Sequence, residues 1–214
     1  MAEDRLKIWE TLFKRALDLI DSTANAGAAL NDWSFGGGTV LMRRYRHRVS
    51  KDIDIFIPDP QYLNYLSPHL NETAESMTGD YVLQADYLKL RFPEGEIDFV
   101  ASAALTDNPV ARETLFGREV LVETSTEIVA KKVWHRGDRF KGRDVYDLAL
   151  VAERDPYALN AIGPVLRDRR DVILTWIIAN ERALRDEFEN LEVLDYRRTF
   201  DECLAIVRTV LENA

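Results

Sequence analysis

The sequence predicts an α+β fold, in which a small mixed sheet flanked by helices precedes a C-terminal helical bundle. Two patterns support this prediction. Strand-like stretches with alternating apolar residues are spread over the first 123 residues, and a run of three glycines separates one of them from a helix. From residue 144 onward, apolar residues recur at helical spacing. We therefore expect a mixed α/β core at 1–123 and a helical part at 124–214 that packs on it.

The elements of the N-terminal part follow from local patterns. Apolar residues at helical spacing predict the helices, period-two alternation predicts the strands, and proline or glycine marks their ends. In order, we expect a helix at 4–24, a strand at 33–35, a helix at 39–45, a strand at 52–57, a helix at 61–77, extended chain at 81–92, a strand at 96–100 and a hairpin at 112–122.

The C-terminal part is expected to be helical throughout. Thr124 and Glu127 have the spacing of a capping box, which predicts that a helix at 128–135 starts just after them. Three longer helical stretches complete the prediction, at 144–153, 164–187 and 196–212.

The composition limits the possible functions. A net charge of −9 argues against broad, sequence-independent binding of nucleic acid. Basic residues nevertheless cluster at 43–51 and 131–143, which fits a phosphate-bearing ligand, although either cluster alone could be a solvated helix face. Cys203 is the single cysteine, which excludes an internal disulfide and is typical of a reducing cytoplasm. The sequence shows neither a secretory leader nor an apolar run that would cross a bilayer.

The strongest functional pattern is Gly36-Gly37-Gly38-Thr39, followed by Asp52-Ile53-Asp54. Glycines at a strand-to-helix turn let the backbone approach a ligand closely, and the free N–H groups of the helix start suit the phosphates of a nucleotide. Asp52 and Asp54 stand two apart on a strand, so both carboxylates are expected on one face. Two carboxylates at about 4 Å repel by roughly 4 kcal/mol at an effective dielectric near 20. A hard divalent cation such as Mg²⁺ removes this repulsion.

A third carboxylate is expected on a neighbouring strand. Asp98 lies among alternating apolar residues in Glu96-Ile97-Asp98-Phe99-Val100. Glu96 shares its face and is a rival, and either acid taken alone could be an exposed strand residue. The flanking apolar residues and the nearby turn favour Asp98.

Two blocks of sequence resemble a known family. The first contains Gly37-Gly38-Thr39-Val40-Leu41 and then Arg48-Val49-Ser50-Lys51-Asp52-Ile53-Asp54. The second contains Glu127-Ile128-Val129-Ala130-Lys131-Lys132 and then Arg143-Asp144-Val145-Tyr146-Asp147. In this order they resemble the AbiEii/AbiGii toxin family of polymerase-β-like nucleotidyltransferases. The resemblance covers about residues 35–150 and implies the polymerase-β-like fold.

The resemblance also implies roles for the acidic residues. Asp52 and Asp54 would be metal ligands, and Asp98 would complete the site around two Mg²⁺ ions. Asp144 would take a functional role and Asp147 a structural one.

For the triphosphate, the resemblance implies a second set of residues. Lys132 fits the family's lysine better than Lys131 and would neutralise triphosphate charge, whereas at least one of these adjacent lysines is expected on a solvated helix face. The residues implied to bind the nucleotide are Gly37, Gly38, Thr39, Arg48, Ser50, Lys132 and Arg143.

These observations give one leading function and two alternatives. The leading function is transfer of a nucleoside monophosphate from a nucleoside triphosphate to a hydroxyl, with release of pyrophosphate, by a toxin-type enzyme acting on RNA such as tRNA. A small-molecule acceptor, such as an antibiotic hydroxyl, is the first alternative. The second is a non-catalytic nucleotide-binding protein paired with an antitoxin.

Overall fold

The computed structural model describes residues 6–214, so the first residues of the helix expected at 4–24 lie outside the described chain. The chain divides into two compact units. Unit 1 consists of residues up to 40, 50–103 and 110–123, whereas unit 2 consists of 41–49, 104–109 and 124–214. The units are therefore not consecutive halves of the chain. Within residues 6–214, no helix is both long and apolar enough to cross a bilayer.

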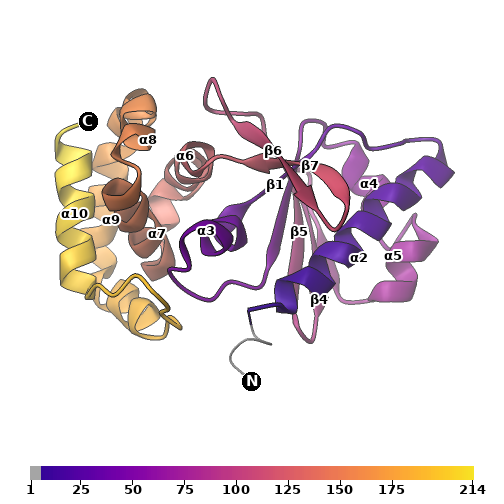
Figure 1. The fold of residues 1–214 in the computed structure, drawn as a ribbon, viewed down its shortest axis with the longest axis horizontal. Coiled ribbons are helices and arrows are strands. Elements are labelled where there is room, and N and C mark those ends of the chain that lie inside the picture. The colour runs from indigo at the N-terminus through magenta and orange to yellow at the C-terminus, as the bar shows by residue number, and fades with distance from the viewer. Residues whose placement is uncertain (1–5) are drawn as a thin grey trace. The chain divides into compact units, whose positions relative to one another are not determined.

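Unit 1 is built on a mixed seven-stranded sheet with the strand order β3-β4-β5-β2-β1-β7-β6 (Figure 1). The strands β2 and β5 run parallel, as do β1 and β7, and the other neighbours are antiparallel. The strands are β1 (Ser34–Gly36), β2 (Ile53–Ile57), β3 (Tyr81–Leu83), β4 (Tyr87–Phe92), β5 (Gly95–Ala101), β6 (Val110–Leu115) and β7 (Arg118–Glu123).

One face of this sheet is covered by the helix α2 (Ile8–Ser22), which ends in the short 3₁₀ helix η1 (Thr23–Ala26) (Figure 1). The apolar stripe of α2 is buried against the odd-numbered apolar residues at 53–57 of β2 and at 97–99 of β5, which are themselves almost completely buried. Because side chains alternate along a strand, the even-numbered residues are on the opposite face. The buried members of this core include Leu12, Phe13, Ile20, Phe35, Ile53, Ile55, Ile97 and Phe99.

The stretch expected to be helical at 61–77 is helical but interrupted, because two short helices occupy this region. They are α4 (Tyr62–Leu66) and α5 (Glu72–Met77). Ser67 is extended and precedes Pro68, and a residue before proline is disfavoured in the helical conformation. Asn71 then starts α5 afresh, since its side chain accepts hydrogen bonds from the backbone N–H groups of Thr73 and Ala74.

Unit 2 is an all-helical packing of α6 (Ser125–Arg136), α7 (Gly142–Arg154), α9 (Gly163–Glu189) and α10 (Phe200–Glu212), with the short helices η2 (Gly137–Arg139) and α8 (Pro156–Ala161). The helix α6 begins as its spacing predicts, because the Thr124 side chain accepts from the Glu127 N–H at 3.2 Å. The Glu127 carboxylate does not close the capping box. It accepts instead from the Leu105 N–H and the Thr106 hydroxyl.

Two further features of unit 2 bear on later arguments. The loop at 46–49 pairs with 192–195, since Leu194 N–H donates to the His47 carbonyl at 2.8 Å and Asp195 N–H to the Arg46 carbonyl at 2.7 Å.

In α10, Cys203 is completely buried. Burial, with a smaller contribution from Glu153, raises the pKa of its thiol to about 12.

Candidate active site

A row of residues crosses unit 1 on the face of the sheet opposite to α2. Strand register places Gly36 of β1 opposite Asp54 of β2, Asp54 beside Asp98 of β5, and Asp98 opposite Lys89 of β4. Residues directly opposite each other on neighbouring strands project on the same face. The structure therefore brings Asp54 and Asp98 together, beside the glycine turn at one end of the row and a lysine at the other.

The glycine turn places backbone directly against the Asp54 carboxylate. Gly37 has a positive φ of 74°, and a Cβ at this position would lie 1.8 Å from Asp54 Oδ2. The helix α3 (Gly37–Tyr45) begins at this residue, so the N–H groups of its first turn start beside the acid pair. Gly37 therefore permits a close approach that no side chain would allow.

We expect Gly37→Ala to destabilise unit 1 and to abolish any catalytic activity that depends on Asp54 and Asp98. The substitution adds left-handed backbone strain, of roughly 1 kcal/mol, to a clash that must displace Asp54. Gly27→Ala is a matched control, because Gly27 has the same φ of 74° but open space around its Cβ position. Urea unfolding of both variants measures the difference. Equal losses of stability would show that the contact with Asp54 is unimportant.

Lys89 is the cation that balances this acidic row. Its Nζ lies 2.9 Å from both Asp98 oxygens and donates to Oδ2, and it also donates to Glu96. Burial, followed by the charge of Asp54, raises the pKa of Asp98 to about 6, although Lys89 opposes that shift. Burial works to lower the pKa of Lys89, but Glu96 and Asp98 outweigh it and raise that pKa. Lys89 is therefore charged whenever Asp98 is ionised.

We expect Lys89→Met to raise the pKa of Asp98 in the metal-free protein. Removal of the ammonium takes away the interaction that favours the charged form of Asp98, so the pKa of this carboxyl rises above about 6. An NMR titration of the side-chain carboxyl groups in EDTA measures the shift. Arg91→Met is the control, because Arg91 contacts Glu96 and Asp80 but not Asp98. An unchanged pKa of Asp98 in Lys89→Met would contradict the role given to Lys89.

Asp52 is placed differently from the expectation. The strand β2 begins at Ile53, and Asp52 Oδ1 accepts the backbone N–H of Glu96 at 3.1 Å. As the side chains lie, no three Asp, Glu, His or Cys residues within 6–214 are arranged to hold a metal ion. Asp54 and Asp98 nevertheless fit a divalent cation, since they are adjacent like charges and Asp98 Oδ1, although 2.9 Å from the Lys89 ammonium, is buried and accepts no hydrogen bond.

Thr39 and Ser50 connect the glycine turn to the acidic strand. Thr39 is fully buried, and its hydroxyl donates to the Asp52 carbonyl at 2.6 Å and lies 3.1 Å from Ser50 Oγ. The hydroxyl therefore fixes the start of α3 to the residue before β2. The sequence suggested a phosphate contact for Thr39, whereas the structure shows it positioning the backbone around Asp52.

Four further candidates lie together in a buried charge cluster in unit 2. Arg48 donates to both oxygens of Asp147 at 2.8 Å, and His47 lies 2.8 Å from the same carboxylate. Lys132 Nζ lies 2.6 Å from Asp144 and 3.1 Å from Asp147. All five side chains are at least nine-tenths buried. Four residues that the sequence predicts for the site therefore lie in this one cluster, namely Arg48, Lys132, Asp144 and Asp147.

The cluster controls the charges of its members. Burial works to raise the pKa of Asp147, but Arg48 and Lys132 outweigh it and hold this pKa well below the usual value. Burial lowers the pKa of His47 despite its contact with Asp147, so the imidazole is neutral at pH 7. Asp144 also caps α7, because its Oδ2 accepts the Lys141 N–H at 3.1 Å.

The two adjacent lysines of α6 are both buried, so the expectation that one lies on a solvated helix face is wrong. Lys131 is 6% exposed and Lys132 is 9% exposed. Lys131 Nζ is 3.5 Å from Glu127, which lies one helical turn earlier. Arg143 is half-buried, and its Nε is buried without a hydrogen bond. The structure thus places Arg143 outside the Asp147 cluster.

Sequence reasoning missed Lys89, which it treated only as a polar residue of an alternating strand. The signal was present in the turn Pro93-Glu94. The strands β4 and β5 close around these two residues with Phe92 opposite Gly95, and counting back from this pair places Lys89 opposite Asp98. The register of this hairpin would therefore have identified the cation that faces Asp98.

Comparison with known proteins identifies a family model and similar folds. The model described as "Nucleotidyl transferase AbiEii toxin, Type IV TA system" matches residues 19–212. A candidate nucleotidyltransferase from Helicobacter pylori superposes with a TM-score of 0.50 at 16% identity, with 96% of this chain and 94% of that chain covered. MenT4, a nucleotidyltransferase toxin from Mycobacterium tuberculosis H37Rv, superposes with a TM-score of 0.48 at 20% identity, with 93% of this chain and 82% of that chain covered. None of the curated proteins matches the chain.

Proposed function

The chain belongs to the AbiEii family of nucleotidyltransferase toxins, and from this premise we propose that it transfers a nucleoside monophosphate from a nucleoside triphosphate to an RNA hydroxyl. The acceptor we favour is a tRNA, and the reaction requires Mg²⁺. The family description names a type IV toxin–antitoxin system, so we also propose an antitoxin as its partner. We place the enzyme in the cytoplasm, in keeping with its single cysteine.

One observation carries this proposal, which is the juxtaposition of Asp54 and Asp98 at the start of α3. Their side chains share one face of the sheet, and Gly37 lets the backbone reach Asp54. One buried oxygen of Asp98 accepts no hydrogen bond and has only the Lys89 ammonium beside it, at 2.9 Å. A helix start next to paired carboxylates suits a triphosphate that arrives together with divalent cations. Mg²⁺ bound here would neutralise charge on the phosphates and on the leaving group.

The residues of unit 1 have distinct roles in this mechanism. The acceptor hydroxyl attacks the α-phosphorus, its new P–O bond forms as the bond to the β-phosphate oxygen breaks, and pyrophosphate leaves. Asp98 takes the proton of the attacking hydroxyl, and Asp54 and Asp98 would hold the metal. Asp52, whose Oδ1 accepts the Glu96 N–H in this structure, would be the third ligand. Gly37 and Gly38 offer backbone N–H groups to the triphosphate.

The other predicted residues support the site from within the protein. Thr39 and Ser50 fix the turn around Asp52. The Arg48 guanidinium donates hydrogen bonds to the Asp147 carboxylate. Lys132 and Asp144 form an ion pair that we propose to be functional, with Lys132 available to triphosphate charge when that pair opens. Arg143, whose Nε has no hydrogen bond, is proposed as a further phosphate contact.

Labelled nucleotides test the function directly. The protein is incubated with each α-labelled nucleoside triphosphate, Mg²⁺ and total RNA, and the label is followed onto RNA by gel electrophoresis. We expect label on RNA and an equal release of pyrophosphate, both lost when EDTA is added. Transfer to a small-molecule hydroxyl with no label on RNA would replace RNA as the acceptor. Binding of nucleotide without transfer to any acceptor would refute the proposed enzyme.

A further inference from the structure

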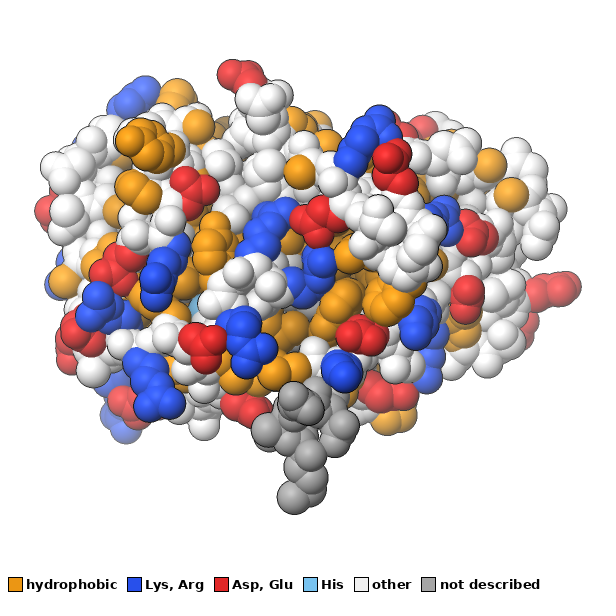
Figure 2. Space-filling model, viewed as in Figure 1, with side chains coloured by type: hydrophobic (Ala, Val, Ile, Leu, Met, Phe, Trp, Pro, Cys, Tyr) orange, Lys and Arg blue, Asp and Glu red, His pale blue; other side chains and the backbone are white. Residues whose placement is uncertain are grey.

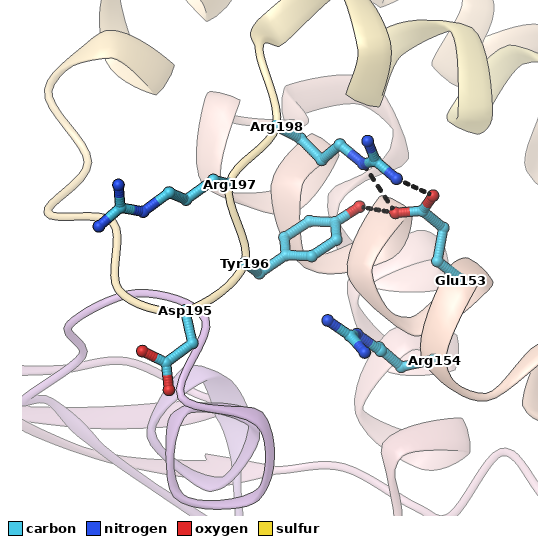
Figure 3. Close-up of a pocket in the computed structure, with 6 residues that line it drawn as sticks. All are labelled: Glu153, Arg154, Asp195, Tyr196, Arg197 and Arg198. Carbon is cyan, nitrogen blue, oxygen red and sulfur yellow. Dashed lines mark hydrogen bonds and ion pairs between the residues drawn. The ribbon is translucent and has the colours of Figure 1, made fainter.

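A pocket in unit 2 is not used by the proposed chemistry. It has a volume of about 460 Å³ and is formed by the C-terminal end of α7 and the segment 195–198, which leads into α10 (Figure 3). Charged residues dominate its lining, which consists of Glu153, Arg154, Asp195, Tyr196, Arg197 and Arg198. The question is which kind of ligand this set of groups would accept.

Both carboxylates of the pocket are already engaged by cations. Glu153 accepts from the Tyr196 hydroxyl at 2.6 Å and from Arg198 at 2.8 Å. Asp195 accepts from Arg46 Nε at 3.0 Å. These bonds satisfy the acidic groups, so the pocket offers few acceptors to an incoming ligand.

Two arginines of the pocket keep their donors available. Arg154 and Arg197 are exposed, and within residues 6–214 neither guanidinium makes a hydrogen bond or ion pair. The charge of Arg154 does contribute to lowering the pKa of Glu153, after the hydrogen bonds from Arg198 and Tyr196. The pocket therefore presents unused N–H donors and an excess of positive charge.

The available donors are not directed at one point. In Figure 3, the Arg154 guanidinium projects into the space beside the Tyr196 ring, whereas the Arg197 guanidinium extends away on the other side of the 195–198 segment. Two separated guanidinium groups suit two separate anionic groups along an extended ligand better than they suit a single small anion. Guanidinium groups bind phosphate oxygens bidentately, and successive phosphates of a polynucleotide provide such a series.

Local charge at this pocket contrasts with the rest of the protein. The whole chain has a net charge of −9, and acidic and basic side chains are interspersed on the face shown in Figure 2. A polyanion would therefore be repelled by the protein as a whole and must be held by local sites. Three arginines against two engaged carboxylates make the pocket one such site.

We propose that Arg154 and Arg197 bind phosphate groups of the acceptor RNA backbone. This inference rests on the proposed function, because it assigns the surface that holds the acceptor of the same reaction. The contacts are to phosphate rather than to bases, so they position the RNA without reading its sequence.

The test compares two double variants that remove the same charge. Arg154→Ala/Arg197→Ala alters the pocket, and Arg170→Ala/Arg182→Ala removes two arginines of α9, outside the pocket, as the control. Binding of fluorescein-labelled tRNA is measured by anisotropy over a range of salt concentrations without nucleotide, and ATP binding is measured separately. Thermal melts establish that both variants fold.

We expect the pocket variant to bind tRNA at least about tenfold more weakly, with the slope of log K against log salt reduced by roughly 1.5 to 2. The control should keep most of the slope, and ATP binding should stay unchanged in both. Unaltered tRNA binding by the pocket variant would overturn the inference, as would an equal loss in the control or weaker ATP binding. A variant that loses affinity for an acidic protein but not for tRNA would assign the pocket to that partner instead.

Label transfer by the unmodified protein separates this inference from the proposed function. Transfer to tRNA by the unmodified protein together with normal tRNA binding by the pocket variant would refute the pocket assignment alone. Absence of transfer to any RNA by the unmodified protein would refute the RNA acceptor, and the pocket assignment with it.

Discussion

Replacing Asp98 with asparagine is expected to abolish nucleotide transfer while making the metal-free protein more stable. Asparagine keeps the shape of the side chain but cannot take a proton or hold a divalent cation as a carboxylate does, so activity should fall by at least about a thousandfold. Stability should rise because the folded protein must ionise a buried carboxyl beside Asp54, which raises the pKa of Asp98 to about 6.

The pH dependence of this gain has a definite sign. The folded-state pKa of Asp98 lies above the unfolded value of 3.8, so the folded protein binds the proton more tightly. The carboxyl therefore favours folding at low pH and loses this contribution as pH rises through about 6. Asp98→Asn should gain roughly 1–3 kcal/mol at pH 7.5 and little at pH 4.

Urea unfolding in EDTA at both pH values measures this gain, and the labelled-nucleotide assay measures the loss of transfer. Asp54→Asn should act in the same direction, because it removes the like charge that repels Asp98. An Asp98→Asn protein that still transfers nucleotide would contradict the site, whereas one that is inactive and destabilised would contradict only the electrostatic account.

Removal of Asp147 is expected to cost the most stability of any single change in unit 2. The carboxylate is fully buried, accepts hydrogen bonds from Arg48 and His47, and forms an ion pair with Lys132 at 3.1 Å. Its loss removes the counter-charge of the buried Arg48, whereas Lys132 keeps Asp144 at 2.6 Å, and breaking a buried pair in this way typically costs about 3–5 kcal/mol. Asp147→Ala should therefore unfold at much lower denaturant concentration than the unmodified protein.

A surface acid provides the control for this prediction. Asp195 pairs with Arg46 at 3.0 Å, but both side chains are more than half exposed. Asp195→Ala should cost no more than roughly 1 kcal/mol, because solvent screens exposed ion pairs. Guanidinium chloride unfolding of the two variants gives the comparison at high ionic strength, and urea gives it at low ionic strength. Similar small losses in both would show that the Asp147 cluster is not structural.

The sequence predicted the central part of the site because local rules determine it. Three glycines followed by a helix and then by Asp-Ile-Asp specified β1, α3 and β2 in order, and the hairpin turn at Pro93-Glu94 specified the register of β5. Strand alternation then placed Asp54 and Asp98 on the face away from α2. These relations involve neighbours on strands, which are the contacts that periodicity describes.

Side-chain partners that are distant in sequence could not be predicted in this way. Arg48 meets Asp147, which lies 99 residues later, and no pattern in one sequence marks such a pair. Asp52 lies just before its strand, so strand alternation did not determine where its side chain points. Its carboxylate accepts a hydrogen bond from the Glu96 N–H. The break between α4 and α5 was predictable, however, because Pro68 and Asn71 are ordinary signals for the end and the start of a helix.

The buried thiol of Cys203 has a practical consequence for experiments on this enzyme. A thiolate is the species that reacts with maleimides, and a pKa of about 12 together with complete burial leaves almost none of it near pH 7. No other cysteine competes, since the chain has only one. A cysteine introduced on the surface should therefore accept a fluorophore or spin label selectively in the otherwise unaltered protein. Such probes would allow the movements of each unit during turnover to be followed directly.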